Sequence, residues 1–236
     1  MFTDQKAYPA QRDRTAQKNI LWLISGLILW AVTVFTLTSV FESPAVALGI
    51  SMVWLLFPLL YAFIAKDMAG IGLTRANLGR VVAETLLVTV IYSLIRNGLI
   101  IFVPASVDYI AASAIQVANL LKQGQFGNLA GPPERLFPLM LFFTFLAAVG
   151  NELFYRGFLF TRIKRHVHWL AASISAAVLF GVYHYFNSGL SGAIMGVVVS
   201  LVSAWLMQRH NNITAPVLFH YLQYVASILV FYFFVL

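Results

Sequence analysis

The sequence predicts an all-helical protein that crosses a membrane several times. Of its 236 residues, 61% are hydrophobic and 10% are charged, whereas soluble domains carry roughly 25% charged residues. Several apolar runs exceed the ~18 residues that a membrane-spanning helix needs. No period-two alternation in ~10-residue pieces, which is typical of a transmembrane β-barrel, occurs. The fold class is therefore a polytopic transmembrane helical bundle.

Hydrophobic segments separated by polar, Gly-rich or Pro-rich connections predict about seven spans, with boundaries placed to within ~2–4 residues. They are expected at residues 20–41, 45–65, 81–103, 136–163, 169–186, 190–207 and 215–236. We divide the chain into a polar N-terminal tail at 1–19, N-terminal spans with an outer connection at 20–135, and a C-terminal core at 136–236.

The distribution of Lys and Arg predicts the orientation, because cytoplasmic connections carry an excess of both. With the N-terminus in the cytoplasm and the C-terminus outside, the cytoplasmic segments hold eleven basic residues: Lys6, Arg12, Arg14, Lys18, Lys66, Arg75, Arg80, Arg162, Lys164, Arg165 and Arg209. The outer connections hold Lys122 and Arg135. The location expected from these features is a membrane that the chain crosses several times.

Other features of the composition narrow the function classes. The net charge of +7 is explained by topology, so no nucleic-acid partner is expected. Cysteine is absent, which excludes disulfides and thiol chemistry. In the long outer connection, Ile110, Ala114, Val117 and Leu121 recur at helical spacing and predict a short amphipathic helix on the membrane surface.

Ionisable residues inside the predicted spans are the candidate functional residues, since such groups are costly in a bilayer. Glu152 and Arg156 stand four residues apart on one helix, so their side chains can pair. His184 and His220 lie on two later spans. Glu and His suit general acid–base catalysis on water and also a divalent metal site. We weigh Arg96, near the outer end of the third span, towards a structural role, because a side chain at that position could extend to the membrane surface.

Three spaced motifs in the C-terminal part resemble the CPBP intramembrane proteases, the family that includes the CAAX prenyl endopeptidases and the bacterial Abi proteins. The family's motifs are Glu-Glu-x-x-x-Arg, Phe-x-x-x-His and His-x-x-x-Asn. The corresponding residues here are Asn151-Glu152-x-x-x-Arg156, Phe180-x-x-x-His184 and His220-x-x-x-Tyr224. The resemblance covers about residues 136–236 and implies a polar site within the C-terminal four-helix part.

This resemblance implies an endopeptidase in which Glu152 and His184 activate water, directly or on a metal. His220, with Tyr224, would stabilise the oxyanion, and Arg156 would orient Glu152. Asn151 and Phe180 are supporting positions. The family's chemistry is described both as metal-dependent and as glutamate-dependent, so Glu152, His184 and His220 are also the expected ligands of a divalent metal such as Zn²⁺. The expected partners are membrane lipid and a peptide or protein substrate at the membrane.

Two departures from the motifs leave other functions open. Asn151 replaces the first Glu, which the family uses to activate water, and an amide cannot accept that proton. Tyr224 replaces the Asn of the third motif, although a phenol can still donate a hydrogen bond. A non-catalytic relative, acting as a membrane scaffold, chaperone or immunity-type protein, is the alternative. A transporter is a third class, but the spans show no inverted repeat.

Overall fold

The structure is a computed structural model, and it describes residues 7–39, 44–75, 77–102 and 133–234. These residues form helices and connecting turns, which confirms the all-helical prediction for the described part of the chain. The elements are α1 (Ala7–Ser39), α2 (Pro44–Ala65), η1 (Ala69–Ile71), α3 (Leu78–Phe102), α5 (Pro133–Glu152), η3 (Leu153–Phe160), α6 (Thr161–Ile163), α7 (Trp169–His210) and α8 (Thr214–Phe234).

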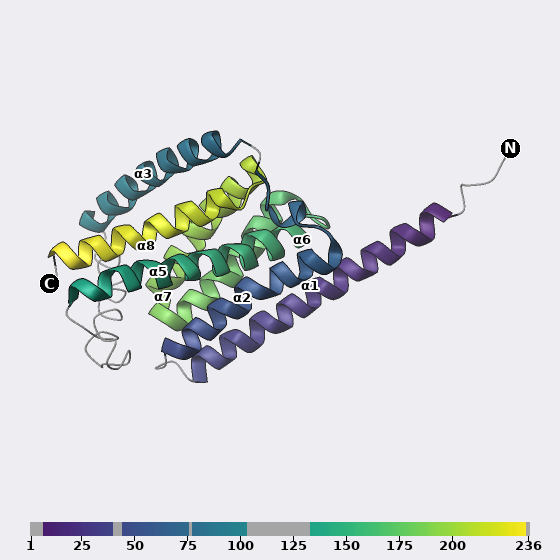
Figure 1. The fold of residues 1–236 in the computed structure, drawn as a ribbon, viewed down its shortest axis with the longest axis horizontal. Coiled ribbons are helices and arrows are strands. Elements are labelled where there is room, and N and C mark those ends of the chain that lie inside the picture. Colours follow the sequence, from purple (N-terminus) through teal and green to yellow (C-terminus); the bar gives the residue numbers. More distant parts are fainter. Residues whose placement is uncertain (1–6, 40–43, 76, 103–132, 235–236) are drawn as a thin grey trace.

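The long helices lie side by side as one bundle (Figure 1). The α5 helix is central, packed between α2 and α8. The α7 helix packs against α8 and η3, while α1 packs on α2 and α3 packs on α8 at the edge of the bundle. The elements that carry the predicted site residues, α5, η3, α7 and α8, therefore form the interior and one side of the bundle.

The α7 helix is a hairpin of two antiparallel halves. Ser188 and Gly189 leave the helical conformation, and Gly189 has φ of +67°. A Cβ atom on Gly181 would lie 2.6 Å from the Val197 side chain, although a straight helix would hold these residues ~24 Å apart. The two halves correspond to the predicted fifth and sixth spans, and the reversal at Gly189 suits a residue that tolerates positive φ.

The predicted fourth span is a continuous rod that changes character next to Glu152. The α5 helix ends at Glu152, the following segment η3 is a π-helix, and α6 completes the rod at Ile163. All eight residues of η3 are buried. Segments of π-helix are rare and often mark functional sites. The wider turn of η3 therefore indicates that the side chains after Glu152 are held in directions that a regular α-helix would not give them.

Aromatic packing from the N-terminal helices fixes η3 in the core. The Trp54 ring of α2 stacks on Phe154 with centroids 5.4 Å apart and meets Tyr155 edge-on at 5.2 Å. The Trp30 Nε1 group of α1 donates a 2.9 Å hydrogen bond to the Tyr155 hydroxyl. A Cβ on Gly150 would lie 2.6 Å from the Ser51 carbonyl oxygen of α2, so glycine permits the close approach of α5 to α2.

At one end of the bundle a carboxylate joins the rod to the turn after α2. Asp67 Oδ2 accepts hydrogen bonds from Arg162 Nη2 at 2.9 Å and from Arg165 Nη2 at 2.7 Å. Arg162, which is 1% exposed, also donates to the Tyr61 hydroxyl. Partial burial alone would raise the pKa of Asp67, but the hydrogen bonds from Arg165 and Arg162 outweigh it and hold the pKa below its usual value.

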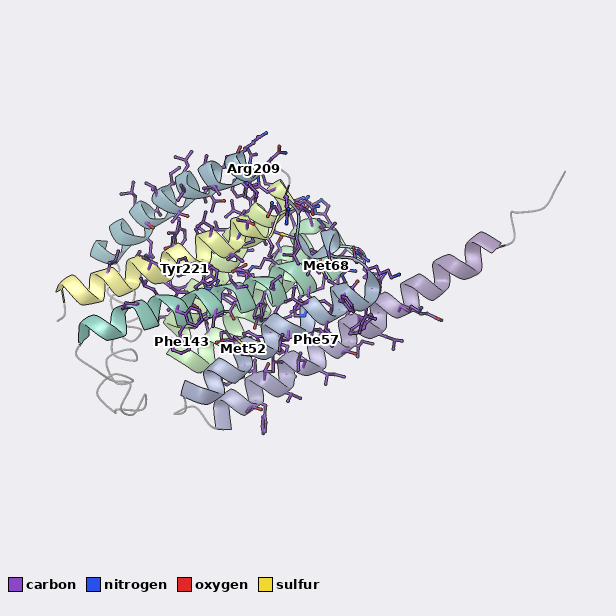
Figure 2. All side chains as sticks on the ribbon, viewed as in Figure 1. Met52, Phe57, Met68, Phe143, Arg209 and Tyr221 are labelled. Carbon is purple, nitrogen blue, oxygen red and sulfur yellow. The ribbon has the colours of Figure 1, made fainter. Side chains whose placement is uncertain are left out.

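This same end gathers basic residues from several connections. Besides Arg162 and Arg165, it carries Arg209 at the end of α7, whose Nε lies 2.6 Å from Glu84 Oε2 of α3. Figure 2 shows Arg209 beside the start of α3. A single basic end is what the predicted orientation requires, and the orientation itself stays a prediction.

The described helices have the apolar character of membrane spans. Four segments are long and apolar enough to cross a bilayer, namely Gln17–Thr36, Leu78–Arg96, Trp169–Phe186 and Ser188–His210, and Gly49–Ala65 is a shorter apolar helix. Large hydrophobic side chains such as Phe35, Leu87 and Ile194 point outward, as expected of lipid-facing surfaces. The protein is therefore an integral membrane protein, and the number of seven spans stays a prediction.

Two predictions about the regions between spans fare differently. The α1 helix begins at Ala7, so much of the segment interpreted as a polar tail continues the first span as helix. The predicted amphipathic helix around Ile110 to Leu121 lies outside the described residues.

The Asp67 contacts predict a pH-dependent contribution to stability. A carboxylate with a lowered pKa stabilises the folded state above its unfolded pKa of about 4, and this stabilisation disappears as the pH falls through the folded pKa. We expect Asp67→Asn to lower the free energy of unfolding by about 1–2 kcal/mol at pH 7. This value is small because solvent screens the charge of a partly exposed carboxylate. The difference from wild type should shrink below about pH 4. Unfolding in detergent at several pH values, with Lys66→Gln as control, measures this; a pH-independent difference would contradict it.

Candidate active site

The central contact of the site joins Glu152 at the end of α5 to His220 on α8. Glu152 Oε1 lies 2.6 Å from His220 Nδ1. Ser203 Oγ of α7 approaches the same carboxylate oxygen at 3.4 Å. Glu152 is 0% exposed and His220 is 3% exposed, so this carboxylate–imidazole pair is enclosed by protein.

The other Glu152 oxygen faces the guanidinium of Arg156. Arg156 Nε lies 3.1 Å from Glu152 Oε2, and both side chains are fully buried. The distance is that of an ion pair, although the angles are not those of a hydrogen bond. The predicted pairing across four residues is therefore present. Burial of such a pair is tolerated where each charge has an opposite partner.

Phe180 contacts the guanidinium of Arg156 and the rings of both histidines. Its ring centroid is 4.5 Å from that of His184 and 5.6 Å from that of His220, and Arg156 Cζ sits 4.7 Å from it. An aromatic face attracts a cation. The Phe of the second motif therefore packs against Arg156 and against both histidine rings.

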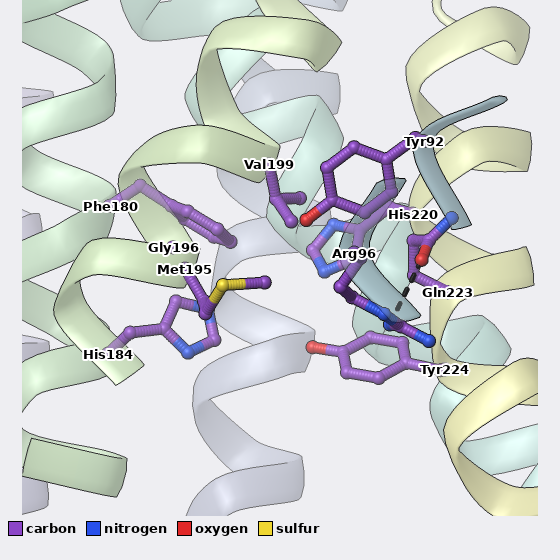
Figure 3. Close-up of a pocket in the computed structure, with 10 residues that line it drawn as sticks. All are labelled: Tyr92, Arg96, Phe180, His184, Met195, Gly196, Val199, His220, Gln223 and Tyr224. Carbon is purple, nitrogen blue, oxygen red and sulfur yellow. Dashed lines mark hydrogen bonds between the residues drawn. The ribbon is translucent and has the colours of Figure 1, made fainter. Parts of the chain in front are cut away.

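A pocket between α3, α7 and α8 adjoins this cluster (Figure 3). Its cavity volume is about 30 Å³, enough for a water molecule or two. His184 lies on one side, while His220 and Tyr224 lie on the opposite side. The lining residues are Tyr92, Arg96, Phe180, His184, Met195, Gly196, Val199, His220, Gln223 and Tyr224.

The structure thus brings the predicted site residues together in two layers. His184, His220, Tyr224 and Phe180 line the pocket, whereas Glu152 and Arg156 are not lining residues and lie behind His220. Asn151 is 3% exposed and is likewise not a lining residue. The two histidines face one cavity, and Glu152 reaches it through His220.

His184 and Tyr224 complete the pocket wall. His184 Nε2 is buried and has no hydrogen-bond partner among the described residues. A Cβ on Gly196 would come within 3.0 Å of the His184 ring, so this glycine leaves the ring its space. The Tyr224 ring stacks on His220 with centroids 4.8 Å apart. Buried polar atoms are usually satisfied, so His184 is suited to contact a water or ligand.

The arrangement does not fit the three-ligand metal site expected from the family. Within the part of the chain that the structure describes, no three His, Cys, Asp or Glu residues gather as a metal site. Glu152 and His220 contact each other directly, whereas metal ligands surround a shared point and leave space for the ion.

Sequence reasoning did not identify the contacts of three residues in or beside the site. Ser203 is fully buried beside Glu152; its signal was a hydroxyl within the predicted sixth span. Arg96 does not extend to the membrane surface: its side chain is 8% exposed, and its Nη1 donates a 3.1 Å hydrogen bond to Gln223 Oε1. Gln223 also donates to Ser93 Oγ at 3.3 Å. An Arg inside a span was itself a signal of a functional site.

The structure is a helical bundle with the character of a membrane protein, and it encloses a polar cluster of Glu, Arg and two His. Residues 133–226 match the family model described as Rce1-like, type II CAAX prenyl endopeptidase. The match confirms the predicted resemblance to the CPBP and CAAX protease family over the C-terminal part of the chain. Searches of curated proteins and of solved structures found no match.

The buried ion pair predicts strongly coupled stability effects of its two partners. Arg156→Leu leaves Glu152 without its guanidinium partner and should lower the free energy of unfolding by about 3–5 kcal/mol. Adding Glu152→Gln to that variant should recover much of the loss, because the amide carries no buried charge. A double-mutant cycle of unfolding in bilayer mimics measures the coupling. Strictly additive losses would contradict the pair.

Proposed function

We propose that the protein is a membrane-embedded endopeptidase that hydrolyses a peptide bond of a membrane-associated substrate. The family match supports a membrane protease-like function. The observation that carries the finer proposal is the 2.6 Å contact between Glu152 and His220, with His220 also lining a pocket. The proposed setting is a bacterial inner membrane, with lipid around the bundle, a peptide in the pocket and no role for nucleic acid.

The proposed base is His220, positioned by Glu152. An ionised carboxylate only accepts hydrogen bonds, so a Glu152 paired with Arg156 fixes the His220 proton on Nδ1. His220 Nε2 then remains unprotonated and can accept a proton from water as the oxygen attacks the substrate carbonyl. Protonated His220 returns that proton to the leaving amine, as histidine does beside a carboxylate in hydrolytic triads.

This assignment changes the roles expected from the family resemblance. Glu152 orients His220 and balances its charge, and Arg156 holds Glu152. His184 and Tyr224, across and beside the pocket, are the proposed donors to the oxyanion that forms at the carbonyl. Asn151 is then not required as a base, because the proton passes to an imidazole and not to the first residue of the motif.

A non-catalytic role is the second candidate, and a specific observation favours it. Asn151 occupies the position of the family's water-activating Glu, and Glu152 is held by three side chains behind the pocket. In this reading the same polar cluster fixes the helices against one another, and the protein acts as a membrane scaffold, chaperone or immunity-type protein.

Cleavage of membrane peptides by the purified protein distinguishes these candidates. Wild type in nanodiscs should release fragments, whereas His220→Gln should lower the rate by about 100-fold or more because general-base catalysis is lost. Glu152→Gln should also lower it, since the amide no longer fixes the tautomer. Asn151→Glu should leave the rate unchanged or alter it modestly.

Two controls make the result specific. His168→Gln changes a histidine at the start of α7, away from the pocket, and should cleave as wild type does. Variant stability is matched by thermal unfolding before rates are compared. No cleavage by wild type, with cleavage gained by Asn151→Glu, would favour the non-catalytic candidate, and a rate that survives His220→Gln would overturn the assigned base.

A further inference from the structure

We propose that α3 is a gate that pivots away from α8 and admits substrate to His220 from the lipid. The inference deepens the proposed function and rests on it for the ligand, a peptide segment that approaches within the bilayer. The cavity beside His220 has a volume of about 30 Å³, which holds a water molecule or two. A peptide backbone does not fit this volume, so a peptidase with this site requires a second arrangement in which one wall of the cavity moves.

The α3 helix is the wall that can move with the least disturbance. The other two walls are α7, which packs against α8, η3 and α1, and α8, which packs against α3, α5 and α7. Among the described elements, α3 packs extensively against α8 alone, and it lies at the edge of the bundle (Figure 1). On its outer face, Leu87 and Leu94 are 61% and 68% exposed. A displacement of α3 therefore opens one helix interface and leaves the other helices in place.

Few polar contacts hold the second half of α3 against α8. Arg96 Nη1 donates a 3.1 Å hydrogen bond to Gln223 Oε1, and Gln223 Nε2 donates to Ser93 Oγ at 3.3 Å. The Tyr92 ring meets Phe219 edge-on with centroids 5.2 Å apart. Within a bilayer the hydrophobic effect does not drive helices together, because lipid chains are as apolar as the helix surfaces. Lipid or an apolar peptide can therefore replace the packing, and the hydrogen bond of Arg96 stabilises the closed arrangement.

The first half of α3 is anchored, so the movement is a pivot. Glu84 Oε2 lies 2.6 Å from Arg209 Nε at the end of α7, and the Ile213 N–H group donates a 2.9 Å hydrogen bond to the Gly72 carbonyl oxygen. Arg96 lies twelve residues beyond Glu84, a rise of ~18 Å along the helix. Neighbouring extended chains need a spacing of ~5 Å. A pivot of about 15° at the anchored end moves Arg96 by that distance.

An opening on this side determines which substrates reach the site. The exposed face of α3 lies in the lipid region, so a chain that passes between α3 and α8 comes from the bilayer. Apolar side chains of Phe180, Met195 and Val199 line the same cavity as His220 and suit an apolar ligand. The inferred substrate is therefore an apolar membrane segment that enters sideways in an extended conformation.

Distances between nitroxide labels, measured by double electron–electron resonance, report the gate without turnover. The chain has no cysteine, so labels attach to introduced cysteines only. One pair of substitutions is Leu94→Cys on α3 with Val32→Cys on α1, and a control pair near the anchored end is Val82→Cys with Leu21→Cys; all four side chains are exposed. In full-length protein in nanodiscs, the first pair should show a second population longer by about 4 Å, as the pivot requires. The control pair should show one distance.

Variants of the closing contact should shift the two populations. Arg96→Met removes the hydrogen bond to Gln223 and should raise the ratio of open to closed protein by about 10-fold or more, as for loss of a hydrogen bond to a charged group. Gln223→Met should act in the same direction and serves if Arg96→Met does not fold. Leu87→Ala shortens a lipid-facing side chain of α3 and should leave the populations as in wild type.

Cross-linking connects the movement to cleavage. The double variant Ser93→Cys and Gln223→Cys, joined by a short bifunctional thiol reagent that reduction removes, should lose cleavage when cross-linked and regain it on reduction. The matched double variant Glu84→Cys and Arg209→Cys joins α3 to α7 at the anchored end. Its cleavage rate should be the same before and after cross-linking, because a pivot leaves that end in place.

The outcomes keep the gate distinct from the proposed peptidase. A single, unchanged distance for the Leu94 pair in wild type and in both Arg96→Met and Gln223→Met would overturn the gate. Equal cleavage with and without the cross-link between α3 and α8 would overturn it as well. Opening without cleavage by any form of the protein would leave the gate and remove the proposed activity, whereas cleavage without opening would do the reverse.

Discussion

The hydrogen bond between Glu152 and His220 is the interaction on which the rest of the structure depends. A carboxylate buried in a membrane bundle is costly unless charges and donors surround it. Here Arg156 contacts one oxygen, while His220 and Ser203 contact the other. Those partners come from the rod and from both α7 and α8, so satisfying one carboxylate requires three segments to meet at one place.

Contacts from the surrounding helices fix the segment that carries Glu152 and Arg156. The π-helix η3 begins at the residue after Glu152 and is wholly buried. Trp30 donates a hydrogen bond to Tyr155, and Trp54 packs edge-on against the same ring. Tyr155 directly precedes Arg156. At the end of the rod, Asp67 binds Arg162 and Arg165. The N-terminal helices, which lie outside the family match, therefore support the motif-bearing helices of the C-terminal part.

The sequence was informative where physical rules act along one helix. Apolar runs predicted the helices, and the spacing of Glu152 and Arg156 predicted their contact, because residues four apart share a helix face. Hydrophobic length also predicted the two halves of α7, and Gly189 marked the turn between them. The three motifs identified the residues of the C-terminal cluster because their order and spacing are specific.

Relations between helices could not be read in the same way. The sequence positions of Glu152 and His220 do not reveal that the two side chains form a hydrogen bond. They also do not reveal that Glu152 lies behind the pocket. The hydrogen bond from Arg96 to Gln223 was not predicted, because the position of Arg96 near the end of a span is compatible with an interfacial side chain. Only the packing of α3 on α8 brings Arg96 to Gln223. The π-helical turn was also invisible, since it follows from packing and not from local propensity.

The protonation of the His220 ring tests the central claim most directly. Solid-state ¹⁵N NMR of protein labelled at histidine, in lipid bilayers at neutral pH, distinguishes protonated from unprotonated ring nitrogens by their chemical shifts. Magnetisation transfer between Glu152 and its neighbouring ring nitrogen identifies the Nδ1 signal of His220. A carboxylate that orients His220 predicts a proton on Nδ1 and an unprotonated Nε2, with mixed tautomers in Glu152→Gln. A proton on Nε2 in wild type, or a tautomer indifferent to Glu152→Gln, would contradict the assigned roles of both residues.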